Sequence, residues 1–182
     1  MCGIVGYVGE RAADAVLLKG LRRLEYRGYD SAGIAVLNGA LSVCKAVGRV
    51  AELEEKLERT PGFEGTIGIA HTRWATHGGV TEANCHPHRD DRSGIALIHN
   101  GIIENAGAIR KALLKRGHTF TSETDTEVLA HLVGEVAALR DELKAKLSGN
   151  ERLEDVRDAR PEIRSALERA EHFLGLAALT AA

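Results

Sequence analysis

The chain has 182 residues, 44% of them hydrophobic, which is enough for one domain with a sizeable core. Its formal net charge is −2 and its 24 basic residues are scattered, so the sequence lacks the basic footprint of a nucleic-acid-binding protein. It has no apolar run of about 18 residues that could span a bilayer and no signal-peptide pattern at its start. We therefore expect a cytoplasmic protein with no nucleic-acid or membrane partner.

The first half of the chain predicts a sheet with helices. Hydrophobic periodicity indicates in order a strand, a helix, a hairpin and a second helix, over 3–8, 12–24, 31–37 with 41–47, and 50–59. Asn38-Gly39 marks the hairpin, because both central positions of such a turn tolerate positive φ. Two more strands are predicted over 66–71 and 94–99, each running into a polar stretch.

The second half predicts helices. A helix over 105–116 ends at Gly117, where a left-handed residue commonly stops a helix. Thr124 and Glu127 have the spacing of a capping box at the start of a long helix that reaches about Leu147. Beyond Leu139 charged residues are dense and β-branched residues are rare, so this tail is expected to be helical rather than sheet-forming.

The three cysteines, Cys2, Cys44 and Cys85, form an odd number without close spacing, which favours reduced thiols. Cys2 follows the initiator methionine, and removal of Met1 would leave it with a thiol and a free α-amine. A thiol of pKa about 8.5 beside an amine of pKa about 7.7–8.0 combines a nucleophile with its own base. A small buried hydrophobe opening a strand is the alternative reading of Cys2. Cys44 and Cys85 lack this arrangement and are expected to be structural.

Four segments carry the strongest signal: MCGIVGY at 1–7, RRLEYRGYDSAGIAV at 22–36, AHTRWATHGG at 70–79, and HNGIIEN at 99–105 followed by SETDTEV at 122–128. In this order they resemble the N-terminal glutaminase domain of the glucosamine-6-phosphate synthase (glutamine:fructose-6-phosphate amidotransferase) family, among the N-terminal-nucleophile, class II glutamine amidotransferases. The resemblance runs from Met1 to about Ala138. It implies an α+β fold, an α-β-β-α sandwich with antiparallel sheets, shortened here and followed by a helical tail over 139–182 of unknown role.

The resemblance also implies a reaction. Cys2 would attack the side-chain amide of L-glutamine, form a γ-glutamyl thioester and release ammonia, with no cofactor. Asn100 and Gly101 would supply the oxyanion hole, for which a side-chain amide next to a backbone N–H is a suitable composition. An Asn-Gly turn joining a strand to a helix is the alternative for this pair.

Further substrate-binding residues follow from the same resemblance. Arg73 would bind the glutamine α-carboxylate and Asp125 the α-amine, although an aspartate that opens a helix often simply caps it. The remaining implied residues are Trp74, Thr76 and His77 in a covering loop, with His86 and Arg27 shaping the pocket.

His71, His77, Cys85, His86 and His88 also invite a metal interpretation, because three of these ligand types fall within residues 85–88. The segment lacks a second ligand pair at zinc-like spacing, so no metal is expected there. 

Two functional hypotheses remain open from sequence. The chain is either a glutamine amidohydrolase, or a truncated glutamine-binding or interaction protein with little or no turnover. A third reading is an incomplete product with a marginal fold. The sugar isomerase half of the family is absent, so the expected partners are glutamine and either a separate sugar-phosphate isomerase or synthase chain or a second copy. Because the tail cannot supply strands, one sheet is expected to be incomplete.

Overall fold

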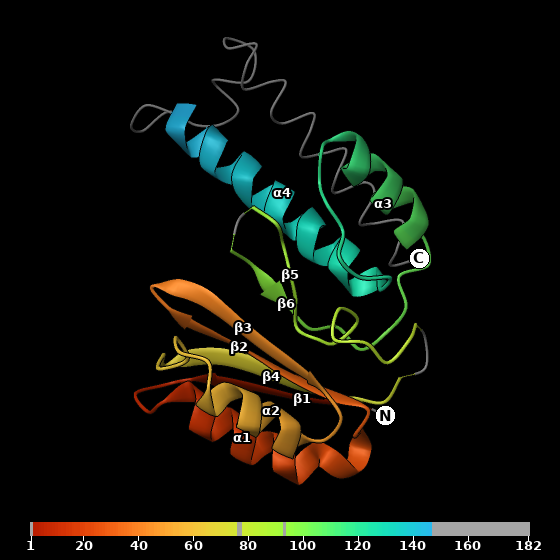
Figure 1. The fold of residues 1–182 in the computed structure, drawn as a ribbon. Coiled ribbons are helices and arrows are strands. Elements are labelled where there is room, and N and C mark those ends of the chain that lie inside the picture. Colours follow the sequence, from red (N-terminus) through yellow and green to blue (C-terminus); the bar gives the residue numbers. More distant parts are fainter. Residues whose placement is uncertain (1, 76–77, 93, 147–182) are drawn as a thin grey trace.

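A computed structural model describes residues 2–75, 78–92 and 94–146 of the chain. Its centre is a four-stranded antiparallel sheet in the order β1-β4-β2-β3 (Figure 1). The strands are β1 (Gly3–Val8), β2 (Ser31–Asn38), β3 (Ala40–Val47) and β4 (Ile67–Arg73). The predicted strand 3–8, the hairpin around Gly39 and the strand near 66–71 are confirmed.

Two helices cover one face of this sheet (Figure 1). They are α1 (Ala13–Leu24) and α2 (Val50–Glu58), and a short 3-10 turn, η1 (Glu25–Arg27), follows α1. Leu17, Leu21 and Leu53 from these helices are fully buried and pack in one core with Ile34 of β2. Burying each such side chain stabilises the fold by about 1.5–3 kcal/mol, so this core fixes the helices on the sheet.

The other face of the sheet meets a second layer. This layer contains a ribbon of β5 (His88–Arg89) and β6 (Ala96–Leu97), and the helices α3 (Ala106–Lys115) and α4 (Asp125–Lys146) (Figure 1). The two helices share a core that includes Ile109, Leu113 and Leu132. The order of layers is the expected α-β-β-α arrangement.

The second sheet is small. Within the described residues it has two strands of two residues each, so the strand predicted over 94–99 was too long. Its ladder has partners only where Ala96 and Leu97 meet Arg89 and His88.

The start of α4 also differs from prediction. The buried Glu127 carboxylate accepts hydrogen bonds from the backbone N–H groups of Thr121 and Ser122, at 2.8 and 2.7 Å, instead of reaching back to Thr124. The Thr124 hydroxyl in turn contacts Nε2 of His88 at 3.0 Å. The predicted capping box is therefore replaced by longer-range bonds that fasten the preceding loop to the helix.

Helix α4 continues through Leu139, which is 4% exposed and belongs to the α3–α4 core. The division of the chain at 138/139 stays a prediction, because residues 147–182 lie outside the described part. Over the described ranges, no helix has the length and apolar character needed to cross a membrane.

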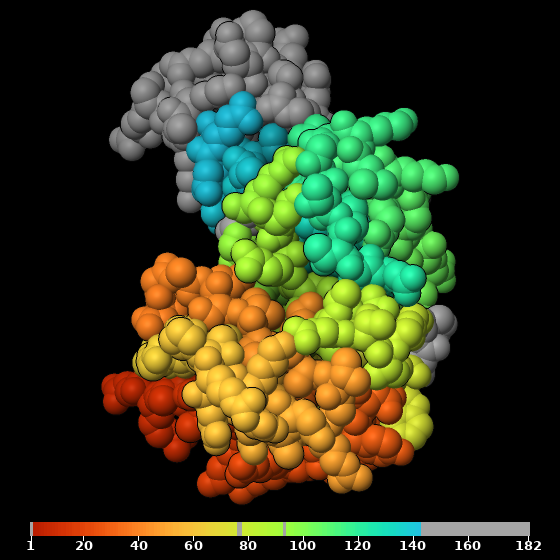
Figure 2. All heavy atoms as spheres, in the orientation of Figure 1, coloured from red at the N-terminus to blue at the C-terminus, as the bar shows by residue number. Residues whose placement is uncertain are grey.

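One end of the central sheet is open on the face away from α1 and α2. Register places Val8, Ile67 and Leu37 side by side there, and they are 78%, 43% and 45% exposed. Figure 2 shows a notch between the orange surface of the β2–β3 hairpin and the blue surface of α4. The second layer therefore covers part of the sheet face, as expected for an incomplete second sheet.

Gly117 ends α3 as the sequence predicts. Its φ is +82°, its N–H donates to the carbonyl of Leu114 at 3.0 Å, and the next N–H, of His118, donates to Leu113 at 3.1 Å. This pair of bonds is the Schellman motif, in which a left-handed residue satisfies the last carbonyls of a helix.

Replacing Gly117 with alanine is expected to lower the free energy of unfolding by about 1 kcal/mol, because a Cβ disfavours positive φ. Gly107 lies inside α3 with open space around its position, so Gly107→Ala should instead stabilise by about 0.5 kcal/mol. Urea unfolding of both variants measures the difference. Equal effects in the two variants would contradict the role of the Gly117 backbone.

Candidate active site

The sheet register brings Cys2 to the end of β4. Gly3 lies opposite Thr72, so Cys2, one residue earlier, lies beside Arg73 and Trp74. The half-buried Cys2 Sγ accepts a hydrogen bond from the Trp74 backbone N–H at 3.3 Å and lies 3.7 Å from the Trp74 carbonyl oxygen. The two contacts with the Trp74 backbone fix the position of the sulfur at the end of β4.

A cavity of about 270 Å³ opens next to this sulfur. Its lining residues are Cys2, Arg73, Trp74, Gly78, His86, Ile102, Ile103, Glu123, Thr124 and Asp125. The structure therefore brings together five of the predicted site residues, from β4, the 85–88 loop and the start of α4. The lining combines a thiol, one guanidinium and two carboxylates, and its volume suits a ligand smaller than a typical drug molecule.

Arg73 and Asp125 are held by different segments. The Arg73 side chain is 5% exposed and donates from Nη1 to the carbonyl of Gly79 at 3.3 Å. The Asp125 carboxylate accepts the backbone N–H of Ile103 at 2.8 Å. Asp125 thus ties the segment that follows Gly101 to the first turn of α4, in addition to opening that helix.

Asn100 and Gly101 are not among the residues that line the cavity, although the next two residues are. The Oδ1 atom of Asn100 lies 2.9 Å from Nε2 of His71 on β4. With Oδ1 as acceptor, His71 carries its proton on Nε2, and the amide nitrogen of Asn100 keeps both of its N–H groups for another partner. The contact fixes which way the Asn100 amide points.

His71 begins a row of three buried imidazoles. The rings of His71 and His86 have centroids 4.5 Å apart, and those of His86 and His88 are 4.7 Å apart. Burial lowers the pKa of His71 to about 4, of His86 to about 2 and of His88 to about 3. All three are therefore neutral at pH 7, and His86 and His88 contact the hydroxyls of Thr126 and Thr124, each at 3.0 Å.

Other predicted residues lie outside this cavity or outside the described chain. Arg27 is in η1, partly buried, and does not line the cavity. Trp74 is 42% exposed, and its ring packs edge-on against Tyr29 with centroids 5.3 Å apart, so it is not a core tryptophan. Thr76 and His77 are not among the described residues.

Asn84 is a site residue that sequence reasoning missed. It is 2% exposed, donates from Nδ2 to the carbonyl of Gly79 at 3.1 Å and accepts the N–H of Glu123 at 3.0 Å. These bonds connect the loop after Arg73 to the residues that precede α4. The sequence around Asn84 gave no signal for this role. Glu123 is distant along the chain, and Gly79 lies in an irregular segment.

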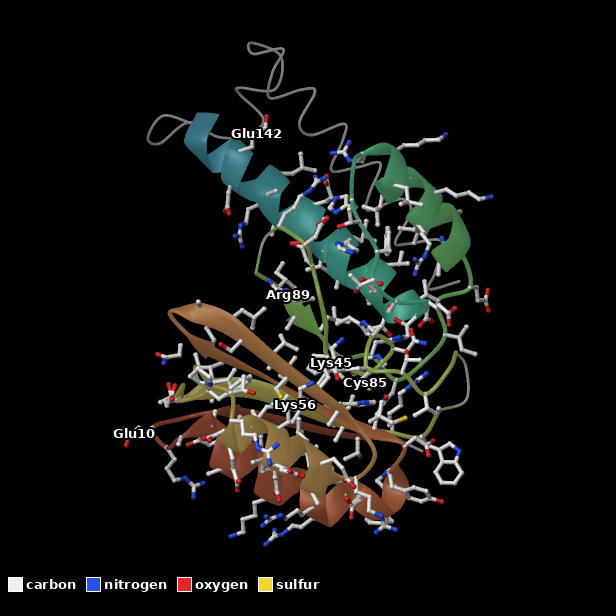
Figure 3. All side chains as sticks on the ribbon, viewed as in Figure 1. Glu10, Lys45, Lys56, Cys85, Arg89 and Glu142 are labelled. Atoms are coloured by element: carbon white, nitrogen blue, oxygen red, sulfur yellow. The ribbon has the colours of Figure 1, made fainter. Side chains whose placement is uncertain are left out.

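The other two thiols are buried, and their structural role stays a prediction. Cys44 is in the core under α1 and α2, and Cys85 lies between the central sheet and the second layer near Lys45 (Figure 3). Burial raises the pKa of both the Cys44 and the Cys85 thiol. Neither is poised to react at neutral pH.

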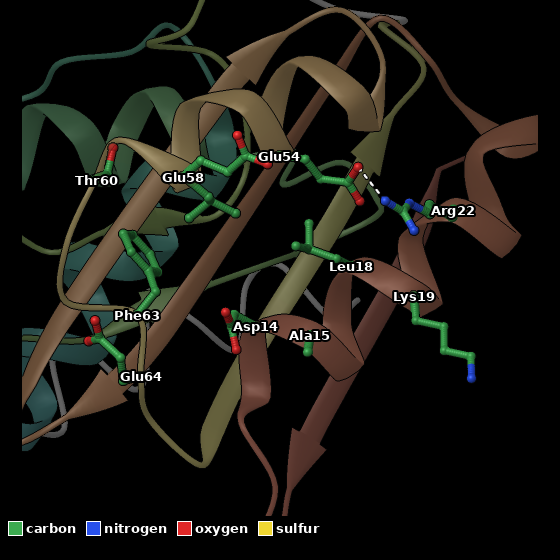
Figure 4. A pocket seen from close by; sticks show the side chains of 11 residues that line it. Asp14, Ala15, Leu18, Lys19, Arg22, Glu54, Glu58, Thr60, Phe63 and Glu64 are labelled. Atoms are coloured by element: carbon green, nitrogen blue, oxygen red, sulfur yellow. Dashed lines mark hydrogen bonds and ion pairs between the residues drawn. The ribbon is translucent and has the colours of Figure 1, made fainter.

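A larger hollow of about 600 Å³ lies between α1 and α2 (Figure 4). Its most prominent polar feature is the ion pair of Arg22 and Glu54 at 2.6 Å, and none of its lining residues is a cysteine or histidine. It lacks the nucleophile and the buried guanidinium that the cavity beside Cys2 provides. The smaller cavity is therefore the candidate active site.

Residues 58–149 match the family model described as a glutamine amidotransferase domain. The chain is 59% identical over 152 residues to the glutamine–fructose-6-phosphate aminotransferase (isomerizing) of Thermus thermophilus, covering 80% of this chain and 25% of that protein. It is 56% identical over 136 residues to the Streptomyces coelicolor protein of the same name, covering 74% and 22%. The chain spans about a quarter of the length of these curated relatives.

Solved structures give the same fold. The glutamine phosphoribosylpyrophosphate amidotransferase of B. subtilis matches with a TM-score of 0.60 and 28% identity over 93% of this chain and 33% of that chain. A structure described as the allosteric regulatory enzyme of purine biosynthesis matches with a TM-score of 0.62 and 31% identity at the same coverage. These likenesses confirm the predicted N-terminal-nucleophile amidotransferase fold.

The row of neutral histidines makes stability fall in acid. Each has a folded-state pKa below its ordinary value near 6.5, so the unfolded chain binds more protons between these values. The free energy of unfolding should be flat above pH 7 and fall from pH 6.5 toward 4, by about 1.4 kcal/mol per pH unit for each such histidine.

Urea unfolding between pH 8 and 4.5 measures this slope. His88→Gln removes one of the three titrating groups while keeping a polar side chain, so its slope should be smaller by about one histidine. A slope identical to that of the parent chain would show that His88 is not a neutral buried group.

Proposed function

The chain belongs to the glutamine amidotransferase family, and we propose that it hydrolyses the side-chain amide of L-glutamine to glutamate and ammonia, the glutaminase half-reaction. The observation that supports this most is the cavity beside Cys2, because it joins a cysteine, a buried arginine and an aspartate. A free amino acid offers a carboxylate and an ammonium for the two charged groups and a side chain for the thiol.

The two charged side chains suit the two ends of the glutamine head group. The Arg73 guanidinium can bind the α-carboxylate through two parallel hydrogen bonds. Asp125, with Glu123 beside it in the lining, offers carboxylate oxygens to the α-ammonium. Charge complementarity of this kind orients glutamine with its amide toward Cys2.

The chemistry then requires a thiolate and a base. After removal of Met1, the Cys2 α-amine takes the thiol proton, and Sγ attacks Cδ of glutamine. The tetrahedral intermediate collapses to a γ-glutamyl thioester as the leaving nitrogen takes up that proton and departs as ammonia. Water then attacks the thioester, which releases glutamate and restores the thiol. The bond from the Trp74 N–H to Sγ supports this step by holding the sulfur in place beside the cavity.

Asn100 and Gly101 would stabilise the oxyanion of the intermediate. The bond from His71 to Asn100 Oδ1 leaves the amide N–H groups available as donors. Asp125 supports the adjacent backbone by accepting from Ile103. A short shift of the 100–103 segment toward Cys2 on glutamine binding would complete the oxyanion hole, since such contacts often tighten only with substrate bound.

One observation favours the alternative, a glutamine-binding protein with little turnover. Asn100 and Gly101 do not line the cavity in this structure, and the second sheet beneath them has two short strands among the described residues. A misplacement of about 1 Å can lower a rate on the order of a hundredfold. Steady-state release of ammonia from glutamine separates the two hypotheses.

The names of the relatives suggest what accepts the ammonia. The curated relatives are matched over about a quarter of their length and are named as fructose-6-phosphate aminotransferases. We propose that a sugar phosphate is the acceptor, bound by a synthase domain or by a separate sugar-phosphate isomerase or synthase chain.

Replacing Cys2 with alanine should abolish ammonia release while leaving glutamine binding measurable by calorimetry, because Arg73 and Asp125 remain. A glutamine analogue with an electrophilic δ carbon should label Cys2, with intact mass confirming loss of Met1. The matched control is Cys44→Ala, which should keep both turnover and labelling. Labelling of Cys44 or Cys85 at a similar rate, or full turnover with Met1 retained, would sink this mechanism.

His71 is expected to act by positioning Asn100. His71→Leu removes the N–H donor and should lower kcat at least about 10-fold with little change in KM, since a single oxyanion donor is worth about 10²–10³ in kcat. His71→Gln keeps an N–H group and should recover part of the rate. Thermal melts check that both variants fold, and a loss confined to KM would contradict the positioning role.

A further inference from the structure

A second polar cluster lies away from Cys2, where three segments meet (Figure 1). Asp90 and Asp91 follow β5, His118 follows α3, and His131 lies in α4. Each offers one ligand atom, and these four atoms all lie within 4.8 Å of one another. We propose that this cluster is a binding site for a zinc ion, with two imidazole and two carboxylate ligands.

Two of the distances between the ligand atoms are close to those around a tetrahedral ion. Nδ1 of His131 lies 3.3 Å from Oδ1 of Asp91 and 3.6 Å from Oδ1 of Asp90. Zinc–nitrogen and zinc–oxygen bonds of about 2.0–2.2 Å put tetrahedral ligand atoms about 3.3–3.5 Å apart. Nδ1 of His118 is closer, 2.8 Å from Oδ1 of Asp91, and would move outward by roughly half an ångström to take its place.

His131 is the observation that points to an ion. Its side chain is 1% exposed, yet its contacts with three carboxylates are 3.3, 3.6 and 3.9 Å long. A charge-assisted hydrogen bond between these groups would measure about 2.7–2.9 Å. Its Nε2 has no hydrogen-bond partner among the described residues, and its Nδ1, which faces Asp90 and Asp91, accepts one long hydrogen bond of 3.4 Å from the backbone N–H of Asp91. The ring is thus buried, and its Nδ1 lies at distances from the Asp90 and Asp91 carboxylates that suit ligands of one shared ion.

His118 has the outer support that a ligating histidine needs. Its Nε2 lies 2.6 Å from Oε1 of Glu135, so this nitrogen can carry the proton and leave the Nδ1 lone pair for the metal. Glu135 is in turn held by Arg116, whose Nη2 is 2.6 Å from Oε2. A carboxylate behind the imidazole fixes its tautomer and orientation and raises its basicity as a ligand.

The cluster also has a route for entry. A hollow of about 530 Å³ is lined by residues that include Asp90, His118, Gly134 and Glu135, and Asp91 is an exposed residue. A bound ion would connect the loop after β5, through Asp90 and Asp91, to the end of α3 at His118 and to α4 at His131. That loop leads through β6 to Asn100, so the bound ion would restrict the motion of the segment before Asn100 without contacting the cavity beside Cys2.

The rival arrangement is an ion-pair network in which a protonated His118 bridges Asp91 and Glu135 without metal. It accounts for the two short His118 contacts, but it leaves His131 with one long hydrogen bond, from the Asp91 N–H, and no close carboxylate contact. Metal binding therefore separates the two arrangements.

The experiment uses the full chain carrying Cys2→Ala, so that the thiol and α-amine of Cys2 cannot chelate the ion. Calorimetric titration with Zn²⁺ alone should give a stoichiometry of one ion per chain. Thermal melts should show a melting temperature that rises with zinc concentration. Co²⁺ in place of zinc should give the intense visible absorption of a tetrahedral site without thiolate bands. Asp91→Asn and His131→Asn should each weaken zinc binding at least about 10-fold.

Glu104→Gln, an exposed carboxylate outside the cluster, is the matched control and should leave binding unchanged. If His131→Asn fails to fold, Asp91→Asn still tests the proposal, because Asp91 is an exposed residue. The proposal is overturned if zinc binds without defined stoichiometry, or if Asp91→Asn binds it as well as the parent does. The readout contains no glutamine, so it is independent of the outcome for glutamine hydrolysis.

Discussion

The pairing of β1 with β4 is the constraint on which the rest of the site depends. With Gly3 opposite Thr72, the residue before β1 falls beside Arg73 and Trp74 at the end of β4. A slip of one residue would turn every β1 side chain to the other face, taking Val5 and Tyr7 away from the core under α1. Hydrophobic burial thus fixes the register, and the register fixes where Cys2 lies.

Neutral, buried histidines form the interior between the two layers. His71, His86 and His88 exchange contacts with an amide and two threonine hydroxyls rather than with carboxylates. Burying charged imidazoles here would require partners that the layer does not offer, whereas the neutral rings need only single hydrogen bonds. The three imidazoles are therefore uncharged beside a cavity whose lining includes Arg73, Glu123 and Asp125.

Local chemistry made much of the fold predictable. The apolar run of β1, the Asn38-Gly39 turn and the glycine at 117 each act within a few residues, and each prediction was confirmed. The errors involve hydrogen-bond partners that the local patterns did not specify. Glu127 bonds to Thr121 and Ser122 in place of Thr124, and the strand over 94–99 shrinks to two residues because its ladder ends with β5.

The residues of the candidate site also fall into those that the sequence predicted and those that it did not. The resemblance supplied Cys2, Arg73 and Asp125, which the fold brings to one cavity, but the roles of all predicted site residues stay predictions. Neither His71 nor Asn84 could be found from spacing, because their partners lie 29 and 39 residues away along the chain. No local pattern encodes such contacts, since they exist only once the two layers are stacked.

Gly33 on β2 shows how closely the two layers approach. A Cβ built there would lie 2.0 Å from the carbonyl oxygen of His86, which no real side chain can accommodate. The spacing between the sheet and the 85–88 loop is thus set by contact between the backbone at Gly33 and the backbone carbonyl of His86. Saturation mutagenesis should find position 33 closed to every other residue, even in combination with changes at 86.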